Sequence, residues 1–489
     1  MSTSNYLPPY KICYSTSMPE LIRPTQAELD RMSHPDKDAL ILLLFDVLAR
    51  YEQRLSEVES KVEKTSQNSS KPPSSDGLKK GPAKPRRPGE KPLGGQPGHQ
   101  GATRAMVDTP DEIRELRPHG LCSCGASLDD LPARLGECRQ QIEIPEPKTV
   151  VTEFQQLCVE CPCCGREHRG EFPAGVTPNV SFGPRLKAYA VGLVQGHFVS
   201  LERTCEIIAD QYGVHPSDGA VQNWLLKAGE LLADDYAANQ QAILAAEVAH
   251  FDESGMRIGG QLNWLHVAAT EKAVYYTVHG KRGQEAMDAA GILPQFQGHT
   301  IHDHWKSYWS YTQCSHSLCN AHHLRELRYC EALTGHFWPG ELRRLLVEGK
   351  EAVAEARAAG QTAVEPARVE ALLARYDQQV QNGLAACPVR LPAPGQKGRV
   401  KQHEATNLLL RLRDYKTQVW RFLTDWRVPF DNNRAERLVR PAKVKLKVTG
   451  GFRAFGGSTA FCILRSVWET NKLNDINPFD TLRLVFEGR

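Results

Sequence analysis

The spacing of apolar residues changes several times along the chain, and the first clear pattern begins at residue 37. Up to Lys64, apolar side chains recur at alternating intervals of three and four residues, which is the spacing of a coiled-coil seam. The pattern predicts a short coiled coil that pairs two copies of the chain, and a helix packed against its own protein remains the alternative. The seam residues are Ile41, Leu44, Leu48, Tyr51, Leu55, Val58 and Val62.

Residues 184–245 have helical spacing throughout, and one part of them is more specific. A helix is expected from Leu201 to Gln211 and another across 220–226, with Gly213 in the turn and Ser217 as the cap of the second helix. This order predicts a helix-turn-helix of the kind that enters the DNA major groove. An ordinary helical pair is the alternative.

From Ala246 the pattern changes to that of strands. The apolar run 245–251 ends at Asp252, two further strands are expected at 263–270 and 273–278, and a helix over 283–290 leads to a strand that ends at Asp303. Strand, strand, strand, helix, strand is the order of an RNase H-like α/β core. Helical spacing then returns over residues 322–424 and predicts a helical insertion within that core.

Three carboxylates in this region are candidates for a metal site. Asp252 and Asp303 follow predicted strands, and Glu436 lies on the helix-like stretch 433–440. Carboxylates are the ligands that Mg²⁺ and Mn²⁺ prefer, and two such ions about 3.5–4 Å apart stabilise the attacking and leaving oxygens of a phosphoryl transfer. Ordinary solvated or helix-capping acids are the alternative.

Composition narrows the class of protein. The 489 residues have room for about three domains, and 41% hydrophobic with 24% charged residues is typical of soluble globular proteins. No stretch has the pattern of a signal peptide or a membrane span. We therefore expect a soluble, intracellular protein with no membrane partner.

The net charge of +3 is small, so binding to a polyanion must come from local basic patches. One such patch is the segment 65–104, which is rich in Ser, Pro, Gly, Lys and Arg and contains Asp76 and Glu90 as its only acids. This composition predicts a flexible linker that neutralises DNA phosphates, and a merely solubilising tether is equally compatible. Its basic residues are Lys71, Lys79, Lys80, Lys84, Arg86, Arg87, Lys91 and Arg104.

Seven of the fourteen cysteines lie between Cys122 and Cys164, a distribution that favours a metal site over disulfides. Cys161 and Cys164 form a Cys-x-x-Cys turn, which suits a tetrahedral Zn²⁺, and Cys122 and Cys124 are the candidate partners. A strand over 143–154 would complete a zinc ribbon. Incidental thiols are the alternative, and the substitute ligands are His119, Cys138, Cys158, Cys163 and His168.

Several motifs occur together and in order from about residue 40 to the C-terminus. They are Ser-Ser-Lys-Pro-Pro-Ser-Ser-Asp (69–76), Gly-Gly-Gln-Pro-Gly-His-Gln-Gly (94–101), the cysteine turn (161–165), Phe-Asp-Glu-Ser (251–254), Cys-Asn-Ala-His-His-Leu-Arg (319–325) and Asp-Asn-Asn-Arg-Ala-Glu-Arg (431–437). With these motifs the chain resembles the transposases of the insertion-sequence-66 group, a branch of the DDE transposases. The pair Cys122 and Cys124 and the segment 303–308 match the family pattern loosely.

The resemblance implies an RNase H-like fold, a zinc-binding domain ahead of it, and Asp252, Asp303 and Glu436 as the catalytic acids that hold Mg²⁺ or Mn²⁺. It further implies cleavage at the transposon end by a metal-activated water, followed by attack of the freed 3′-hydroxyl on target DNA. The implied partners are transposon ends and target DNA, a second copy of the chain or more, and the accessory proteins that some elements of the family encode. The implied location is the bacterial cytoplasm, in association with the nucleoid. His322, in the Cys-x-Ala-His motif, supports the site in this interpretation.

Basic residues near Glu436 are candidates for phosphate contacts, with a solvated helix face as the alternative. Two other functions are compatible with the motifs: a catalytically silent DNA-binding regulator derived from a transposase, and a nuclease that only hydrolyses. The candidate DNA-binding residues are Arg434, Arg437, Arg440, Lys443, Lys445 and Lys447.

Together these patterns divide the chain into seven parts. They are an unassigned arm (1–36), a coiled-coil helix (37–64), a flexible basic linker (65–110), a zinc-binding domain (111–176), a helix-turn-helix-like domain (177–245), an α/β catalytic core in two pieces (246–330 and 425–489) and a helical insertion (331–424).

Overall fold

The structure is a computed structural model that describes residues 25–62, 104–129, 131–173, 175–176, 178–392, 398 and 400–489. Two helices begin it, α1 (Gln26–Arg31) and α2 (His34–Val62), so the helix predicted over 37–64 is confirmed as far as Val62. The seam residues Ile41, Leu44, Leu48 and Tyr51 are 40–56% exposed, because no other described residue covers them. Pairing with a second copy stays a prediction. The basic linker lies outside the described residues up to residue 103.

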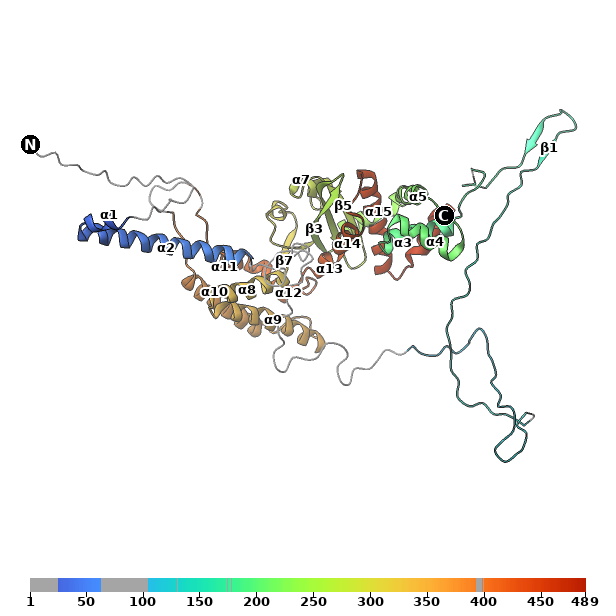
Figure 1. Cartoon of the computed structure of the whole chain (residues 1–489), viewed down its shortest axis with the longest axis horizontal. Coiled ribbons are helices and arrows are strands. Elements are labelled where there is room, and N and C mark those ends of the chain that lie inside the picture. The colour runs from blue at the N-terminus through green and yellow to red at the C-terminus, as the bar shows by residue number, and fades with distance from the viewer. Residues whose placement is uncertain are drawn as a thin grey trace, which may run out of the picture.

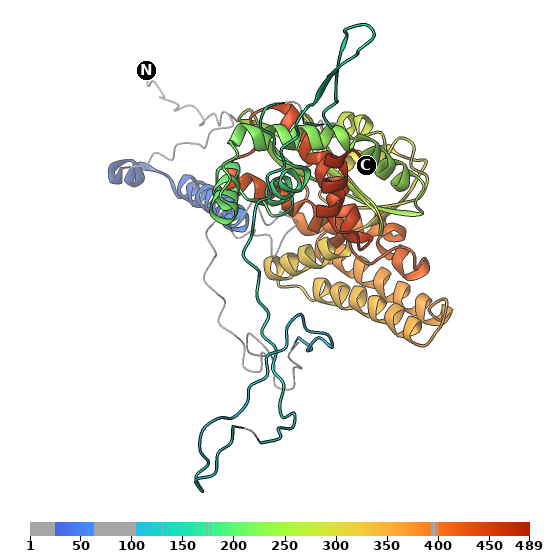
Figure 2. The same ribbon diagram turned by 90° about the vertical axis from the view of Figure 1, so that its right-hand side faces the viewer.

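The described residues between 104 and 176 form an extended segment in Figure 1 and Figure 2. Its regular structure is one hairpin, β1 (Cys158–Glu160) paired with β2 (Glu167–Arg169). The strand predicted over 143–154 is wrong, since those residues have no partner strand and their side chains are exposed. Apolar residues alone do not make a strand without a neighbour that accepts and donates its backbone hydrogen bonds.

Four helices follow, as predicted for 184–245: α3 (Pro184–Gly196), α4 (Leu201–Tyr212), α5 (Asp218–Leu231) and α6 (Ala233–Leu244). The side chain of Ser217 accepts a hydrogen bond at the start of α5, and Gly213 ends α4 in the left-handed conformation, which glycine adopts without strain. The predicted helix, glycine turn, serine cap and helix are therefore confirmed as local structure.

The last two helices, α15 (Phe455–Leu473) and α16 (Pro478–Glu487), pack against α3 and α5 and share one hydrophobic core with them (Figure 1). The packing is close at Gly196, where a Cβ would overlap the Trp468 ring. The C-terminal part of the chain thus covers the helices that precede the sheet.

The central sheet has five strands in the order β5-β4-β3-β6-β7. The first three form an antiparallel meander, and β6 and β7 extend the sheet by parallel pairing with β3 and with each other. A helix, α7 (Gln284–Ala289), connects β5 to β6. The strands are β3 (Val248–Ile258), β4 (Gln261–Ala269), β5 (Val274–His279), β6 (His299–His302) and β7 (Ser315–Leu318).

The predicted end of the first strand at Asp252 is wrong, because β3 continues to Ile258. Its pairing with β4 runs from His250–Ala269 to Ile258–Gln261 and holds the polar second half of the strand in the sheet. A glycine-rich segment, 450–457, contacts the end of β3: the N–H of Phe452 donates to the carbonyl of Arg257 at 2.9 Å. Gly451 has a φ of 125° and leaves no room for a Cβ against the Arg257 backbone.

Different helices cover the two faces of the sheet. Ala268 and Phe251 contribute to a core with α7 and the residues after it, whereas Val267 on the opposite face packs with Ala435 and Phe461. Ala435 belongs to α13 (Asn433–Leu438), which is followed by α14 (Arg440–Thr449). The face with Val267 is therefore the one that α13, α14 and α15 cover.

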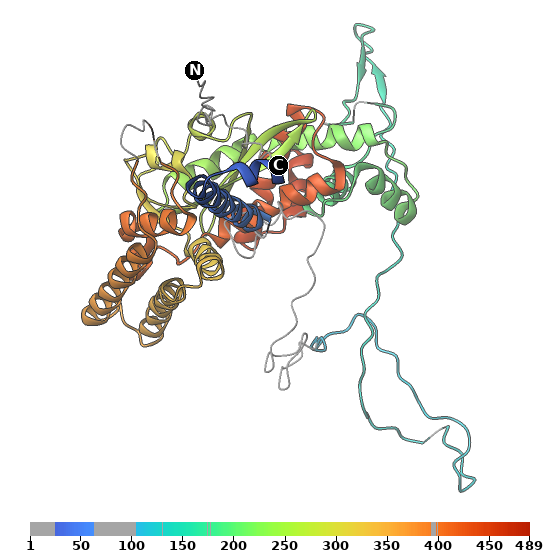
Figure 3. The ribbon, with the colours of Figure 1, turned by 60° about the vertical axis from the view of Figure 1, so that its left-hand side comes forward.

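Between β7 and α13 the chain forms a helical unit, as predicted. Its five helices enclose a hydrophobic core of their own, which includes Leu342, Tyr376 and Trp420, and Figure 3 shows them in yellow to orange beside the sheet. No described helix is long and apolar enough to cross a membrane. The five helices are α8 (Asn320–Thr334), α9 (Trp338–Ala358), α10 (Pro366–Ala386), α11 (Glu404–Asp414) and α12 (Lys416–Thr424).

Candidate active site

Asp252 lies in β3, and Asp303 directly follows β6, the strand that pairs with β3 in parallel. The pairing sets Val248 opposite His299 and His250 opposite Ile301 and ends there, so the two aspartates lie just beyond the paired residues at the same end of the two strands. Asp252 pairs with Val267 on its other side. Because paired residues point to the same face, the Asp252 side chain leaves the sheet on the face that α13 covers.

The third carboxylate, Glu436, lies on α13, and Asn432 fixes the start of this helix to β3. The Asn432 amide donates to the carbonyl of Phe251 at 2.7 Å, and its oxygen lies 2.9 Å from Nδ1 of His250. Asn432 is 1% exposed. A segment more than 180 residues downstream is thereby held beside the two residues that precede Asp252.

Electrostatics show that the carboxylates influence one another. Burial raises the pKa of Asp252 well above its usual value, and the charges of Glu253, Asp303 and Glu436 raise it further. Burial, followed by the charge of Glu253, raises the pKa of Asp303 to about 7, while the Trp305 N–H, which donates to Asp303 at 2.8 Å, acts in the opposite direction. Carboxylates that repel one another in a buried place favour a bound cation.

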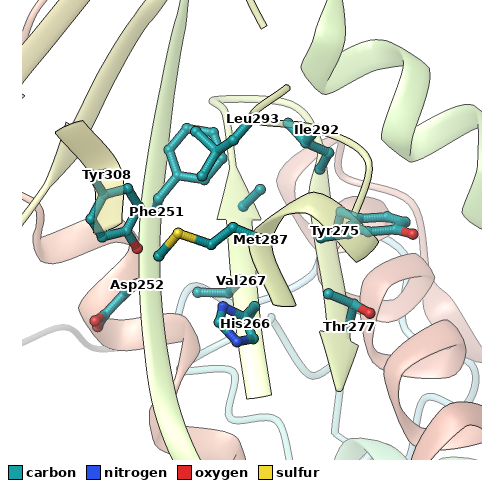
Figure 4. A pocket seen from close by; sticks show the side chains of 12 residues that line it. Phe251, Asp252, His266, Val267, Tyr275, Thr277, Met287, Ile292, Leu293 and Tyr308 are labelled. Atoms are coloured by element: carbon teal, nitrogen blue, oxygen red, sulfur yellow. The ribbon is translucent and has the colours of Figure 1, made fainter. Parts of the chain in front are cut away.

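Glu253 is a fourth acid that the sequence analysis did not single out. Its side chain is only 1% exposed, and it accepts hydrogen bonds from Tyr308 at 2.8 Å and from Arg282 at 2.9 Å. The Arg282 guanidinium stacks 3.8 Å above the Trp305 ring. Figure 4 shows Tyr308 close to Asp252 at the edge of a pocket. The sequence signal for Glu253 is its position next to Asp252 in the Phe-Asp-Glu-Ser motif. Because side chains alternate along a strand, that position predicts a Glu253 side chain on the face of the sheet opposite to Asp252.

Glu436 contacts three side chains at the start of α8. Its Oε1 lies 3.3 Å from Sγ of Cys319 and 3.3 Å from Nδ1 of His322, and its Oε2 lies 3.6 Å from the Arg325 guanidinium. A cavity of about 170 Å³ adjoins this group and is lined by Asp303, Cys319 and His322, among others. The cavity thus lies between Asp303 and the two side chains, Cys319 and His322, that contact Glu436.

The histidines around the site differ in their surroundings. His302 is fully buried, stacks 4.3 Å from the Tyr308 ring and lies 2.9 Å from His316, and burial lowers its pKa to about 3. His323 is also buried and pairs with Asn320 at 3.0 Å. Both are held within the protein, whereas His322 reaches Glu436.

The model of the Transposase IS66 family matches residues 179–460, which is more than half of the chain. The chain belongs to the IS66 family of transposases. The matched range begins just before α3, ends within α15 and includes Asp252, Asp303 and Glu436. The model of the Family of unknown function (DUF6444) matches residues 22–105, the part with α1, α2 and the basic linker. No curated protein matches the chain.

Three of the six basic residues predicted to contact DNA are exposed in this IS66 transposase, namely Arg437, Arg440 and Lys447. The others take part in the fold. Arg434 donates to the carbonyl of Thr270 at 3.0 Å and Lys443 to that of Gly255 at 3.2 Å. The ammonium group of the sixth, Lys445, lies 5.8 Å from the Phe452 ring centre, and burial lowers its pKa.

The cysteines of the predicted zinc site form two similar turns in the transposase. The N–H of Gly125 donates to the carbonyl of Cys122 and that of Gly165 to the carbonyl of Cys161, at 2.8 and 2.9 Å. The N–H groups of Cys163 and Cys164 lower the pKa of the Cys161 thiol, as suits a metal ligand. The structure does not bring the two turns together, since among the described residues the metal-binding geometry occurs only at Cys319, His322 and Glu436.

Proposed function

We propose that this IS66 transposase cleaves the DNA at the ends of an insertion sequence and joins them to target DNA, with Asp252, Asp303 and Glu436 as a DDE triad. The single observation that supports the proposal is electrostatic: the charges of Asp303 and Glu436 raise the pKa of Asp252, so the three carboxylates lie within range of one another's charge. Their oxygens do not all lie within 4.8 Å of one another, since the described residues hold such a group only at Cys319, His322 and Glu436. Shared ions therefore require the three carboxylates to approach one another. The strand order β5-β4-β3-β6-β7, with an antiparallel meander and two parallel strands, supports an RNase H-like core.

The triad fits Mg²⁺ or Mn²⁺. Its donors are all carboxylate oxygens, and their mutual repulsion in a buried place is what a divalent cation relieves. When bound, the ions supply a water of lowered pKa and stabilise the attacking and leaving oxygens. Asn432 fixes the start of α13 beside β3, which limits how far Glu436 must move to share the ions with Asp252 and Asp303.

The exposed residues Arg437, Arg440 and Lys447 lie on the helices that follow Asn432, where they are available to DNA phosphates close to the triad. The pair α4 and α5 is the proposed helix-turn-helix that reads the transposon end. Zn²⁺ at Cys122, Cys124, Cys161 and Cys164 stays a proposal that requires the two cysteine turns to approach each other.

We also propose that the exposed seam of α2 pairs two copies of the transposase. The pairing would bury Leu44 and Leu48 between two helices, and burial of this kind is the usual role of a coiled-coil seam. Light scattering should give a dimer or a larger assembly for the full chain and a smaller one after Leu44→Asp and Leu48→Asp. An unchanged mass would refute the pairing.

The decisive experiment incubates the full chain and Mg²⁺ with DNA that carries the inverted repeats flanking its gene. Cleaved ends and joined products are expected, and Asp252→Asn should abolish both while retaining DNA binding. Asp235→Asn, which changes an exposed acid on α6, is the matched control.

Two outcomes would support other functions. Tight binding without any cleavage by the unchanged protein would favour a regulator, and nicks without joined products would favour a nuclease. Full strand transfer by the Asp252→Asn variant would exclude the triad.

A further inference from the structure

We propose that Cys319, His322 and Glu436 form a binding site for a borderline divalent cation, Zn²⁺ or Co²⁺, which shares Glu436 with the carboxylate site. The thiol and the imidazole belong to the segment that joins β7 to α8 and to the first turn of α8, and Glu436 comes from α13. One potential ligand atom from each residue lies within 4.8 Å of the other two. The site does not depend on DNA cleavage by this protein.

Two of the three distances between the ligand atoms match a tetrahedral ion, and the third, between Sγ of Cys319 and a ring nitrogen of His322, is within 4.8 Å. With a Zn–S bond of about 2.3 Å and Zn–N and Zn–O bonds of about 2.0–2.2 Å, the ligand atoms around zinc lie roughly 3.3–3.7 Å apart. Oε1 of Glu436 lies 3.3 Å from Sγ of Cys319 and 3.3 Å from Nδ1 of His322. Binding therefore needs only small movements, with loss of the thiol proton to solvent.

The surroundings of His322 and Cys319 also indicate a bound cation. Nδ1 of His322 is buried and makes no hydrogen bond of normal geometry, although Oε1 of Glu436 lies 3.3 Å from it. A cation between the two atoms would use the lone pairs of both. Sγ of Cys319 accepts the backbone N–H of Asn432 at 3.2 Å. An N–H that points at sulfur stabilises a thiolate and is the usual support of a metal-bound cysteine.

The donor set selects the kind of cation. Mg²⁺ prefers oxygen ligands, whereas a thiolate with an imidazole and a carboxylate suits Zn²⁺ or Co²⁺. Three protein ligands leave a fourth position open, as in catalytic rather than structural zinc sites. The 170 Å³ cavity lined by Cys319, His322 and Asp303 adjoins this position and has room for waters or a phosphate group. Arg325, 3.6 Å from Oε2 of Glu436, is placed to hold the second carboxylate oxygen.

The test counts ions in the full-length protein and uses cobalt as a spectroscopic probe. After equilibrium dialysis against Co²⁺ with excess Mg²⁺, the Cys319→Ser variant should hold one ion fewer per chain than the unchanged protein and should lose the corresponding sulfur-to-cobalt absorption. Cys330→Ser is the matched control, since Cys330 is also buried and lies on α8, the helix that carries His322, outside the site, and it should lose neither. Ions at the cysteines of 122–164 contribute equally to all three proteins and cancel in the comparison.

Equal ion counts and spectra for the Cys319→Ser variant and the unchanged protein would overturn the proposal. If Cys319→Ser fails to fold by circular dichroism, His322→Asn replaces it, with the same expected loss of one ion. The Asp252→Asn variant separates this inference from the proposed function: it should lose DNA cleavage and keep the cobalt spectrum.

Discussion

The side-chain amide of Asn432 donates to the backbone carbonyl of Phe251 at 2.7 Å, so the start of α13 is fixed to the residue that precedes Asp252. The same side chain pairs with His250, and its backbone N–H donates to Cys319. Asn432 therefore connects three segments that are remote in the sequence. It touches none of the reacting atoms, so it is a positioning residue.

The first prediction is that Asn432→Asp weakens both fold and activity. A carboxylate keeps the shape but cannot donate to Phe251, and the buried carbonyl loses its partner, which costs about 1–3 kcal/mol. Misplacement of Glu436 by about 1 Å should lower cleavage roughly 100-fold. Thermal unfolding and DNA cleavage at several Mg²⁺ concentrations measure the two effects.

Asn433→Asp is the control for this experiment, because Asn433 is the next residue and is exposed. It should leave both stability and cleavage near those of the unchanged protein. Equal behaviour of the two variants would show that Asn432 does not position Glu436.

The second prediction concerns pH and the metal-free protein. Asp303 has a pKa of about 7 in the folded chain against an ordinary value of 3.8, so folding penalises its charged form. The penalty is absent below about pH 4, grows as the pH rises and is complete above about pH 7. Removal of the carboxylate charge should therefore stabilise the metal-free protein at pH 8 by up to about 4 kcal/mol, and not at pH 4.

Asp303→Asn is the variant for this measurement, since its amide oxygen still accepts the N–H of Trp305. Urea unfolding in the presence of a chelator at pH 4, 6 and 8 gives the difference in stability. A difference that stays constant across this range would contradict the raised pKa. With Mg²⁺ present the order should reverse, because the unchanged protein alone gains the binding free energy of the ion.

The third prediction concerns the buried Glu253. Arg282→Ala leaves this carboxylate without its ionic partner and should cost about 3–5 kcal/mol. The double variant Arg282→Ala with Glu253→Gln should recover much of that loss, because the uncompensated charge is gone. Thermal unfolding at neutral pH checks both values, and a double variant no more stable than Arg282→Ala would show that charge burial is not the cause.

The sequence predicted four of the five strands and the helical insertion, because strand and helix periods are local properties, whereas the short strand β7 was not predicted. It also indicated Asp252, Asp303 and Glu436, which lie in β3, directly after β6 and on α13. What it did not reveal are contacts that depend on pairing. The length of β3 is set by β4, and the ligand-like group at Cys319 requires α8 and α13 to meet. Neither is encoded in the residues near Asp252 or Cys319 alone.

The local structure of the helix-turn-helix could be predicted from the sequence, but its packing partners could not. Ser217 and Gly213 mark the turn in the sequence, and the local structure agrees. The packing of Trp468 and Phe479 against α3 was not predicted, because an amphipathic helix such as α15 indicates that one face is covered without indicating by which partner.

The last prediction separates basic residues by their role. Arg440→Ala removes an exposed charge on α14, so it should weaken DNA binding about equally for all sequences and lower the slope of log affinity against log salt by about 1. Arg434→Ala removes the hydrogen bond to the carbonyl of Thr270, so it should lower the melting temperature instead. Binding titrations over a range of salt concentrations, together with melting curves, distinguish the two. An unchanged salt slope for Arg440→Ala would mean that this face of α14 does not meet DNA, and the phosphate contacts would then have to come from elsewhere, with the basic segment 65–104 as the first candidate.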